Sequence, residues 1–426
     1  MILNYSVFTS SASTYTFSVL PQRESAAFQP GAVHVALSGL AALAIAMGIG
    51  RFAFTPILPM MQEDLGVSLP EGGWLASANY LGYFVGALSA IGMRVKPVSA
   101  IRAGLLIIGL STLGMALEHE FWLWLVLRLL AGIASAWVLV FVSSLALGRL
   151  SALGHSQLGG VVYAGVGVGI VAAGMACLAL MGLRASSSDA WITLGLAALG
   201  ASGLIWRSIQ PATPPGESPK SEAESTVWSA QCWWLVLCYG AFGFGYIIPA
   251  TFLPVMAREI VADPALFGWA WPVFGAAAVV STLLAAHAAT WLTHRGVWIF
   301  GNLAMALGVV FPVVVPGLGG ILAAAFFVGG TFMVITMAGM QEARRLAGAR
   351  ARPLMAVMTS AFALGQIIGP LSVAYLIKVG GDFAAALVLA SALLALSAIA
   401  LRATSGFQTV SERTEGIKAR TWGEKT

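Results

Sequence analysis

Two arginines in the sequence fall inside apolar stretches that are long enough to cross a membrane. Arg51 lies within residues 34–61 and Arg128 within residues 121–147. A charge at the centre of a membrane helix costs about 2.5–3.5 kcal/mol on insertion scales, so each guanidinium must face a cavity or a partner. The fork of an arginine side chain makes paired hydrogen bonds to carboxylate or phosphate. These residues therefore indicate capture of an anion.

The acidic residues support this interpretation by their positions. All 17 Asp and Glu residues, Glu342 among them, are assigned to loops, tails or helix ends. Two embedded arginines without an embedded carboxylate give a positive interior, which favours an anionic ligand over a cationic drug. Proton relays usually contain embedded Asp, Glu or His. His287 is the one mid-helix candidate for proton coupling, and a lone histidine can equally be a hydrogen-bonded packing residue.

Both arginines also have a structural interpretation. Arg51 can be held by backbone carbonyls or extend towards the membrane surface. Arg128 can bond to the carbonyls of neighbouring helices and hold the N-terminal half together. These alternatives stay open at the level of sequence.

An internal repeat links Arg51 to a second position. The stretch GIGRFAFTPILPMM at 48–61 returns as GFGYIIPATFLPVM at 243–256, with a constant offset of 195. The offset places Tyr246 at the position of Arg51. A site between two repeats of a membrane protein can open to either side, so we expect Arg51 and Tyr246 to face one central cavity.

The composition assigns the chain to the membrane. Of its 426 residues, 59% are hydrophobic and 9% are charged, against about 25% charged in soluble domains. The net charge of +5 does not indicate nucleic-acid binding, because the basic residues lie in short loops between apolar runs. The three cysteines have no CxxC partner, which supports neither a disulfide framework nor a zinc site. We expect no metal and no cofactor.

A membrane-spanning helix needs about 20 apolar residues, and the sequence contains twelve such runs. They lie near 34–61, 72–92, 101–117, 121–147, 158–181, 189–207, 231–256, 266–291, 297–316, 318–340, 354–378 and 383–401. The predicted fold class is an all-α membrane protein with two pseudo-symmetric six-helix halves.

The basic residues predict the orientation of these helices. With the N-terminus in the cytoplasm, 17 of the 22 Lys and Arg residues lie on the cytoplasmic side and three on the opposite side. This bias places both termini in the cytoplasm, and we expect the cytoplasmic (inner) membrane.

The chain is expected to divide into five parts. Residues 1–33 form a cytoplasmic segment without the features of a signal peptide, either disordered or upstream of the true start. The N-terminal half is 34–207, the proline-rich linker 208–230, the C-terminal half 231–402 and the cytoplasmic tail 403–426.

The chain resembles the major facilitator superfamily over residues 34–402, and its motifs are similar to the YbfB/YjiJ branch. The motifs are GIGRFAFTPILPMM, GGWLASANYLGYFVGAL at 72–88, YAGVGVGI at 163–170 and GQIIGP at 365–370. The resemblance implies a permease with the major facilitator fold. It also implies that helices two, five and eleven, with the glycine pairs Gly82/Gly86, Gly165/Gly169 and Gly365/Gly369, line the contact between the halves.

Two superfamily motifs are incomplete. The connection after the second helix has Arg94 and Lys96 but no Asp, and the fifth helix lacks the proline of the antiporter motif. Arg128 and Gly132 keep the Arg-x-x-x-Gly spacing of many drug–proton antiporters.

Further polar and aromatic side chains are candidates for the cavity, and each can equally pack between helices or anchor at the membrane surface. They are Asn79, Tyr80, Tyr83, Trp137, Tyr163, Thr331, Thr336 and Gln366.

The sequence favours a secondary transporter for a small organic anion that functions as a monomer. Drug–proton efflux is the alternative, supported by Arg128 and Gly132 and weakened by the missing carboxylate and proline. A membrane sensor would need a sizeable soluble output domain, which the linker and the tail do not offer. Nothing supports an enzyme, because neither a phosphate-binding loop nor a zinc-protease motif is present.

Overall fold

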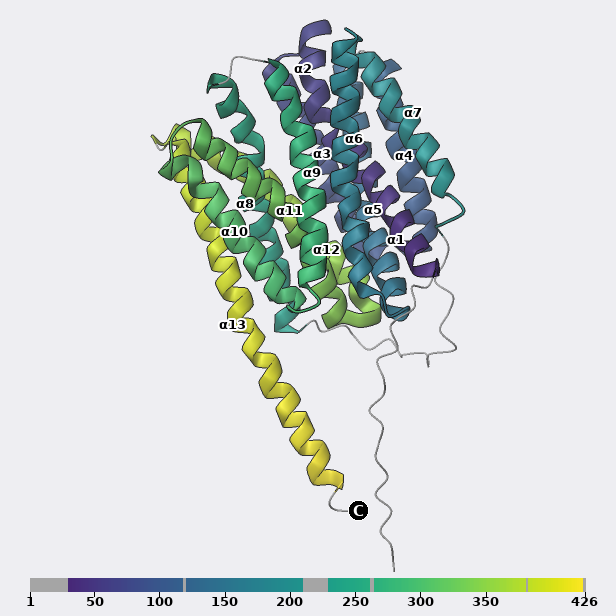
Figure 1. The fold of residues 1–426 in the computed structure, drawn as a ribbon, viewed down its shortest axis with the longest axis vertical. Coiled ribbons are helices and arrows are strands. Elements are labelled where there is room, and N and C mark those ends of the chain that lie inside the picture. Colours follow the sequence, from purple (N-terminus) through teal and green to yellow (C-terminus); the bar gives the residue numbers. More distant parts are fainter. Residues whose placement is uncertain (1–29, 118–119, 210–228, 261–263, 381, 424–426) are drawn as a thin grey trace, which may run out of the picture.

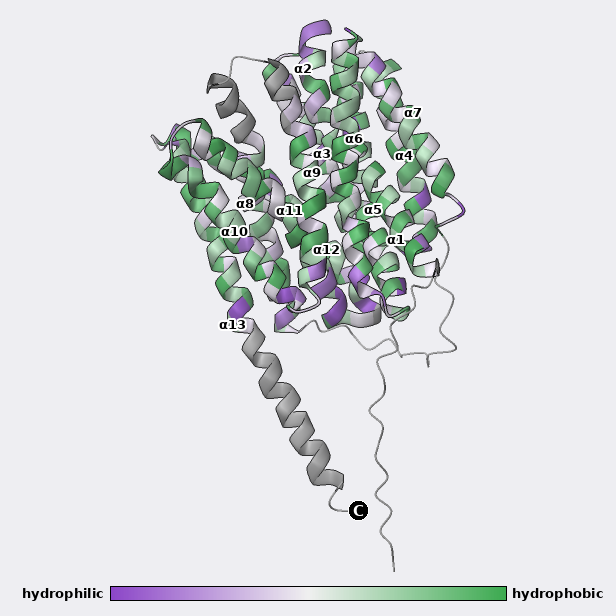
Figure 2. Ribbon diagram, viewed as in Figure 1, coloured by the Kyte–Doolittle hydropathy of each residue, from purple (hydrophilic) through white to green (hydrophobic). Residues whose placement is uncertain are grey.

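The computed structural model describes residues 30–117, 120–209, 229–260, 264–380 and 382–423, with only the backbone at 30, 252–260, 264–268, 270, 349 and 405–423. The described chain folds into long helices that run side by side along the molecule (Figure 1). Apolar residues cover the middle of the bundle and hydrophilic residues gather at its ends (Figure 2).

The helices before residue 210 form the N-terminal half. They are α1 (Pro30–Leu43), η1 (Ala44–Phe52), α2 (Phe54–Asp64), α3 (Leu69–Gly92), α4 (Pro97–Leu117), α5 (Phe121–Ala152), η2 (Ser156–Leu158), α6 (Gly159–Gly182) and α7 (Ser187–Ile205). The helices after residue 229 form the C-terminal half. They are α8 (Ala230–Ile260), α9 (Pro264–Ala288), α10 (His294–Val314), α11 (Leu318–Ala347), η3 (Gly348–Arg350), α12 (Ala351–Lys378) and α13 (Phe383–Gly423).

Eleven of the described helical segments are long and apolar enough to cross a membrane. The first of them is continuous from Gly31 to Asp64 and combines α1, η1 and α2. The helix α3 has 24 residues but is not among the eleven. Its small and polar residues, such as Asn79, lower its hydropathy. The expected number of twelve spans therefore stays a prediction.

The first span is not a uniform α-helix. Its middle, Ala44–Phe52, is a nine-residue π-helix. Such segments are rare and occur often at functional sites. The repeat-related helix α8 is α-helical from Ala230 to Ile260. The two copies of the repeat thus differ in backbone at the position of Arg51.

The two halves meet along two pairs of helices, α6 with α9 and α3 with α12. Glycines bring α6 and α9 together: a Cβ built on Gly167 would lie 2.6 Å from the carbonyl oxygen of Gly275, and one on Gly174 would lie 2.9 Å from Pro272. Small residues of this kind allow two membrane helices to approach closely. We call this contact the glycine seam; it consists of Gly160, Gly167, Gly174 and Gly275.

The glycine pairs of helices two, five and eleven lie on other faces of α3, α6 and α12. Gly82 and Gly86 face the backbone of α5, Gly165 and Gly169 face α1 and η1, and Gly365 and Gly369 face α8. Each pair packs two helices of the same half. The expectation that helices two, five and eleven line the contact between the halves is confirmed, since these helices are α3, α6 and α12. The glycine pairs themselves face neighbours of the same half, because a glycine pair indicates close packing without saying which neighbour it meets.

The halves are also joined where several arginines gather. Arg344 of α11 donates from Nη2 to the carbonyl of Gly148 in α5 at 3.4 Å. The guanidinium of Arg352 in α12 lies 5.4 Å from the ring centre of Phe141 in α5. We call this end of the bundle, with Arg149, Arg344 and Arg352, the arginine-rich end.

Candidate functional site

Arg51 lies in the π-helical segment η1, between the two halves. Its side chain is buried, with 5% of its surface exposed. Its Nη2 donates a hydrogen bond of 2.8 Å to Oε1 of Gln366 on α12. The embedded cation of the N-terminal half is thus bound to a neutral amide of the C-terminal half.

Aromatic rings surround the guanidinium. The Cζ atom of Arg51 lies 4.0 Å from the ring centre of Tyr83, 5.7 Å from that of Phe52 and 5.8 Å from that of Tyr80. The face of an aromatic ring attracts a cation, most strongly where water is excluded. The rings stabilise the buried charge without neutralising it.

The neighbouring helices hold the backbone of η1 in place. Ser135 donates to the carbonyl of Ala46 at 2.7 Å, and Asn79 donates to that of Gly50 at 3.2 Å. Arg128 donates from Nη2 to the carbonyl of Arg51 at 3.4 Å. In the membrane these carbonyls have no water to bond to, so the donors from α3 and α5 stabilise the π-helix.

Arg128 and Asn79 therefore bond to the backbone at Arg51 and not to its side chain. Asn79 also donates to the carbonyl of Arg128 at 3.0 Å. The guanidinium of Arg128 lies 4.5 Å from the ring centre of Phe54. These contacts match the structural interpretation of Arg128, whose direct binding of a substrate stays untested.

The site has spare hydrogen-bonding capacity and an unbalanced positive charge. Nε of Arg51, Nε of Arg128 and Oδ1 of Asn79 are buried without a hydrogen-bond partner among the described residues. In the same part of the chain, no salt bridge involves Arg51 or Arg128. A buried polar group that lacks a partner costs about 1–3 kcal/mol.

Tyr246, the repeat counterpart of Arg51, is buried in α8 among aromatic rings. It stacks on Phe332 with ring centres 5.4 Å apart and planes 19° apart. Phe332 in turn meets Phe52 across the contact between the halves, at 6.1 Å. Phe332 thus contacts both Tyr246 and Phe52, the residue that follows Arg51.

Four of the other cavity candidates bond within the bundle. Trp137 donates to Oγ of Ser89 at 2.8 Å, and Tyr163 donates to Oγ of Ser143 at 2.7 Å. Thr331 and Thr336 donate to backbone carbonyls of their own helix, α11. Of the residues predicted as secondary candidates, the structure brings Tyr80, Tyr83 and Gln366 to Arg51 and Asn79 to the backbone beside it.

The sequence placed His287 in mid-helix, but the structure places it near a helix end. It is exposed, one residue before the end of α9, with its ring 4.7 Å from that of Trp291. The apolar run continues past His287, so hydropathy alone placed the helix end too late. Its role in proton coupling stays a prediction.

The sequence did not predict that the carboxylate of Glu342 is buried. Glu342 of α11 is 1% exposed and accepts from Nε of Arg295 at 3.0 Å. It also accepts from Nε of Arg345 at 2.8 Å. The spacing of Glu342 and Arg345 on one helix is a signal of pairing, whereas Arg295 is 47 residues away and only the fold brings it close.

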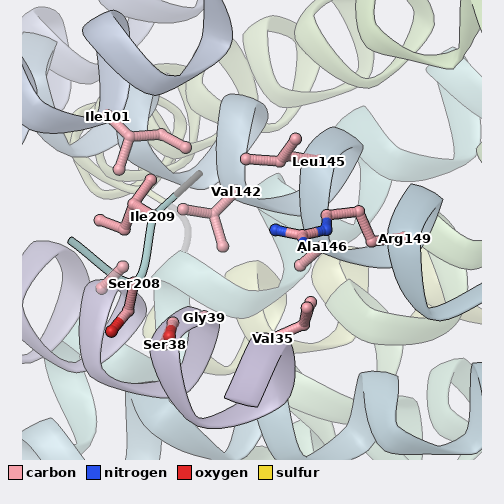
Figure 3. A pocket seen from close by; sticks show the side chains of 11 residues that line it. Val35, Ser38, Gly39, Ile101, Val142, Leu145, Ala146, Arg149, Ser208 and Ile209 are labelled. Carbon is pink, nitrogen blue, oxygen red and sulfur yellow. The ribbon is translucent and has the colours of Figure 1, made fainter. Parts of the chain in front are cut away.

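A small cavity of about 30 Å³ lies apart from Arg51 (Figure 3). Apolar side chains of α1, α4 and α5 line it together with Arg149, Ser38 and Ser208. Arg149 places it at the arginine-rich end. Its volume suits about one or two water molecules, and none of the residues that contact the Arg51 guanidinium lines it.

The apolar helices and the buried site between two halves define a multi-pass membrane protein of the major facilitator type. The chain belongs to the family described as uncharacterised MFS-type transporter YbfB, whose model matches residues 43–402. The matched range includes Arg51, Tyr246 and Gln366. A comparison with curated proteins gave no match.

Proposed function

We propose that the protein is a secondary active transporter that moves a small organic anion across the cytoplasmic membrane by alternating access. The family supports transport. In this proposal α3 also crosses the membrane, which brings the number of spans to twelve. The arginine-rich end and both termini lie in the cytoplasm, because most basic residues of the loops are on that side. Family membership likewise favours a transporter over an enzyme.

The observation that carries the proposal is the bond between Arg51 and Gln366. This hydrogen bond joins the two halves and is buried. Its donor carries a full positive charge, whereas its acceptor is neutral. When the halves separate, the guanidinium loses this acceptor. A carboxylate or phosphate then provides a stronger partner, because charge-assisted bonds are roughly twice as strong as neutral ones.

Drug–proton efflux is less well supported. That function usually needs a carboxylate beside the substrate, whereas the described partners of the Arg51 guanidinium are a neutral amide and aromatic rings. Gly132, which keeps the antiporter spacing with Arg128, lies against the backbone of Asn79, where a Cβ would come within 2.2 Å of the carbonyl oxygen. Close helix packing explains that glycine.

The direct test is to place a carboxylate beside Arg51. Gln366→Glu changes one atom group and adds a negative charge at the atom that now accepts from Arg51. We expect a folded protein whose affinity for anions falls at least about tenfold, because the internal carboxylate competes with the ligand. Gln341→Glu is the matched control, since Gln341 is a buried glutamine of α11 beside Gly159, outside the site.

Thermal-shift measurements on the purified full-length chain provide the readout, because ligands that bind the folded state raise its melting temperature. The panel consists of benzoate, acetate, inorganic phosphate and the tetraphenylphosphonium cation. We expect stabilisation by at least one of the anions in the parent protein and in Gln341→Glu, and its loss in Gln366→Glu. Stabilisation by the cation alone would contradict the proposal.

A further inference from the structure

We infer that the anion carries a planar aromatic ring: the site is built for an aromatic carboxylate whose ring lies against Phe52, Trp271 and Phe332. This inference rests on the proposed function and adds the nature of the group attached to the carboxylate. Three features support it: the rings that cross between the halves, the stacked rings behind them, and an indole N–H without a partner.

The first feature is the position of Phe52. This residue follows Arg51 in η1, and its ring lies 5.7 Å from the Arg51 guanidinium. It meets two rings of the C-terminal half, Trp271 at 6.2 Å and Phe332 at 6.1 Å. The halves therefore touch through aromatic rings directly beside the cation. When they separate, these rings lose one another and expose flat apolar faces.

The second feature is the set of rings behind this contact. Trp271 stacks on Phe274 with ring centres 5.4 Å apart and planes 6° apart. Phe274 stacks on Phe332 at 5.2 Å and 22°, and Phe332 on Tyr246 at 5.4 Å and 19°. Offset stacking is a preferred arrangement of aromatic pairs. The C-terminal half thus presents nearly parallel rings, which suit a flat ligand better than a bulky aliphatic one.

The third feature is Nε1 of Trp271, which is buried without a hydrogen-bond partner among the described residues. Buried indole N–H groups usually find an acceptor. The ring of Phe52 is near both residues: its centre lies 6.2 Å from the ring centre of Trp271 and 5.7 Å from Cζ of Arg51. A ligand with a carboxylate at one end and an oxygen substituent at the other would meet both donors.

These features place the substrate in the class of hydroxylated aromatic carboxylates. The carboxylate bonds to Arg51 in place of Gln366, the ring takes up the contact that Phe52 makes with Trp271 and Phe332, and the hydroxyl oxygen accepts from Trp271. An aliphatic anion satisfies the first of these contacts alone.

The test compares probes that differ in one property each. Benzoate and cyclohexanecarboxylate share the charge and the approximate size, but only benzoate has a π face; benzamide keeps the ring without the charge. We expect the full-length protein to bind benzoate about fivefold or more tightly than cyclohexanecarboxylate. Equal affinities would overturn the inference and leave the proposed function standing. If no anion binds at all, the proposed function itself fails.

Two variants locate the ring. Phe52→Leu should reduce the preference for benzoate over cyclohexanecarboxylate, because one of the three rings is lost, while Phe311→Leu, the control, should keep it unchanged. Phe311 also stacks on a phenylalanine, Phe327, at 5.7 Å, but in α10 and α11. An undiminished preference in Phe52→Leu would overturn the assigned place of the ring, and cyclohexanecarboxylate shows whether this variant still binds anions.

A third variant tests the indole donor. Trp271→Phe keeps the ring and removes the N–H. We expect the affinity for 4-hydroxybenzoate to fall about threefold to tenfold and that for benzoate to stay within about twofold, since a hydrogen bond contributes about that much in net terms. An equal fall for both ligands, or no fall for either, would remove the donor role of Trp271.

Discussion

The two regions with buried arginines differ in what balances their charge. At the arginine-rich end, Glu342 accepts from Arg295 at 3.0 Å and from Arg345 at 2.8 Å. In the middle of the bundle, Arg51 donates to the amide of Gln366 and, among the residues that the structure describes, forms no salt bridge. A cation beside a carboxylate is already matched, whereas a cation beside an amide can still attract a mobile anion.

Burial alone does not separate these two kinds of arginine. Arg51 and Arg295 are buried to nearly the same degree, 5% and 4% exposed. Their acceptors distinguish them, and these acceptors lie 315 and 47 residues away in sequence. The comparison predicts that changes near Glu342 alter stability, whereas changes near Arg51 alter ligand binding.

The largest expected effect is on stability. Glu342→Gln removes the carboxylate and leaves Arg295 buried without its counter-charge, which should lower the free energy of unfolding by about 3–5 kcal/mol. The melting temperature of the purified protein measures this loss. Anion affinity in the protein that remains folded should not change. A loss of affinity with normal stability would contradict a purely structural role for Glu342.

The next effect is on binding. Arg51→Ala should reduce anion binding by about 2–5 kcal/mol, because the charge of the substrate is left unpaired in a buried site. Arg51→Lys keeps the charge but not the fork, so binding should weaken less. Affinity and melting temperature are measured on the same preparation. A lower melting temperature with unchanged affinity would make Arg51 a structural residue like Arg295.

A smaller effect is expected where only neutral groups are involved. Asn79→Ala removes the donors to the carbonyls of Gly50 and Arg128, at about 1 kcal/mol for each hydrogen bond. Because these bonds support η1, both the melting temperature and the anion affinity should fall modestly. An effect confined to stability would show that the π-helical backbone does not have to be held for the ligand to bind.

The smallest effect is expected at His287. As an exposed residue, its replacement by alanine should alter stability by no more than about 0.5 kcal/mol and leave anion affinity unchanged. If a proton moves with the substrate through this residue, the pH dependence of uptake into proteoliposomes will shift in His287→Ala. Identical pH profiles for the variant and the parent would exclude the residue from coupling.

The sequence predicted the helices well, because long apolar runs leave little choice in a bilayer. It also pointed to Arg51 and Tyr246 through the repeat, and to Gln366 through its polar side chain within an apolar run. It did not predict that Arg51 bonds to Gln366, since 315 residues separate them. The π-helix was equally hidden: the two repeats align without a gap from Gly48 to Trp74, so nothing in their spacing marks the different backbone.

Glu342 shows a second reason why prediction from sequence stops short. Its place near the end of an apolar run suggested contact with water, but α11 continues to Ala347 and the arginines of two helices enclose the carboxylate. Hydropathy measures the average character of a stretch. It does not say whether one charged side chain at the end of that stretch turns to solvent or to a partner.

The glycine seam has a consequence for how such a protein can change over generations. Where Gly167 meets Gly275, an added methyl group would collide with backbone atoms that have no rotamer to yield. The rings at Phe52 and Trp271, in contrast, are side chains that can be exchanged for others of similar volume. We expect functional variants from a random library to be depleted of changes in the seam and to tolerate replacements at the rings. New substrate preferences would then arise without any change in the glycine seam.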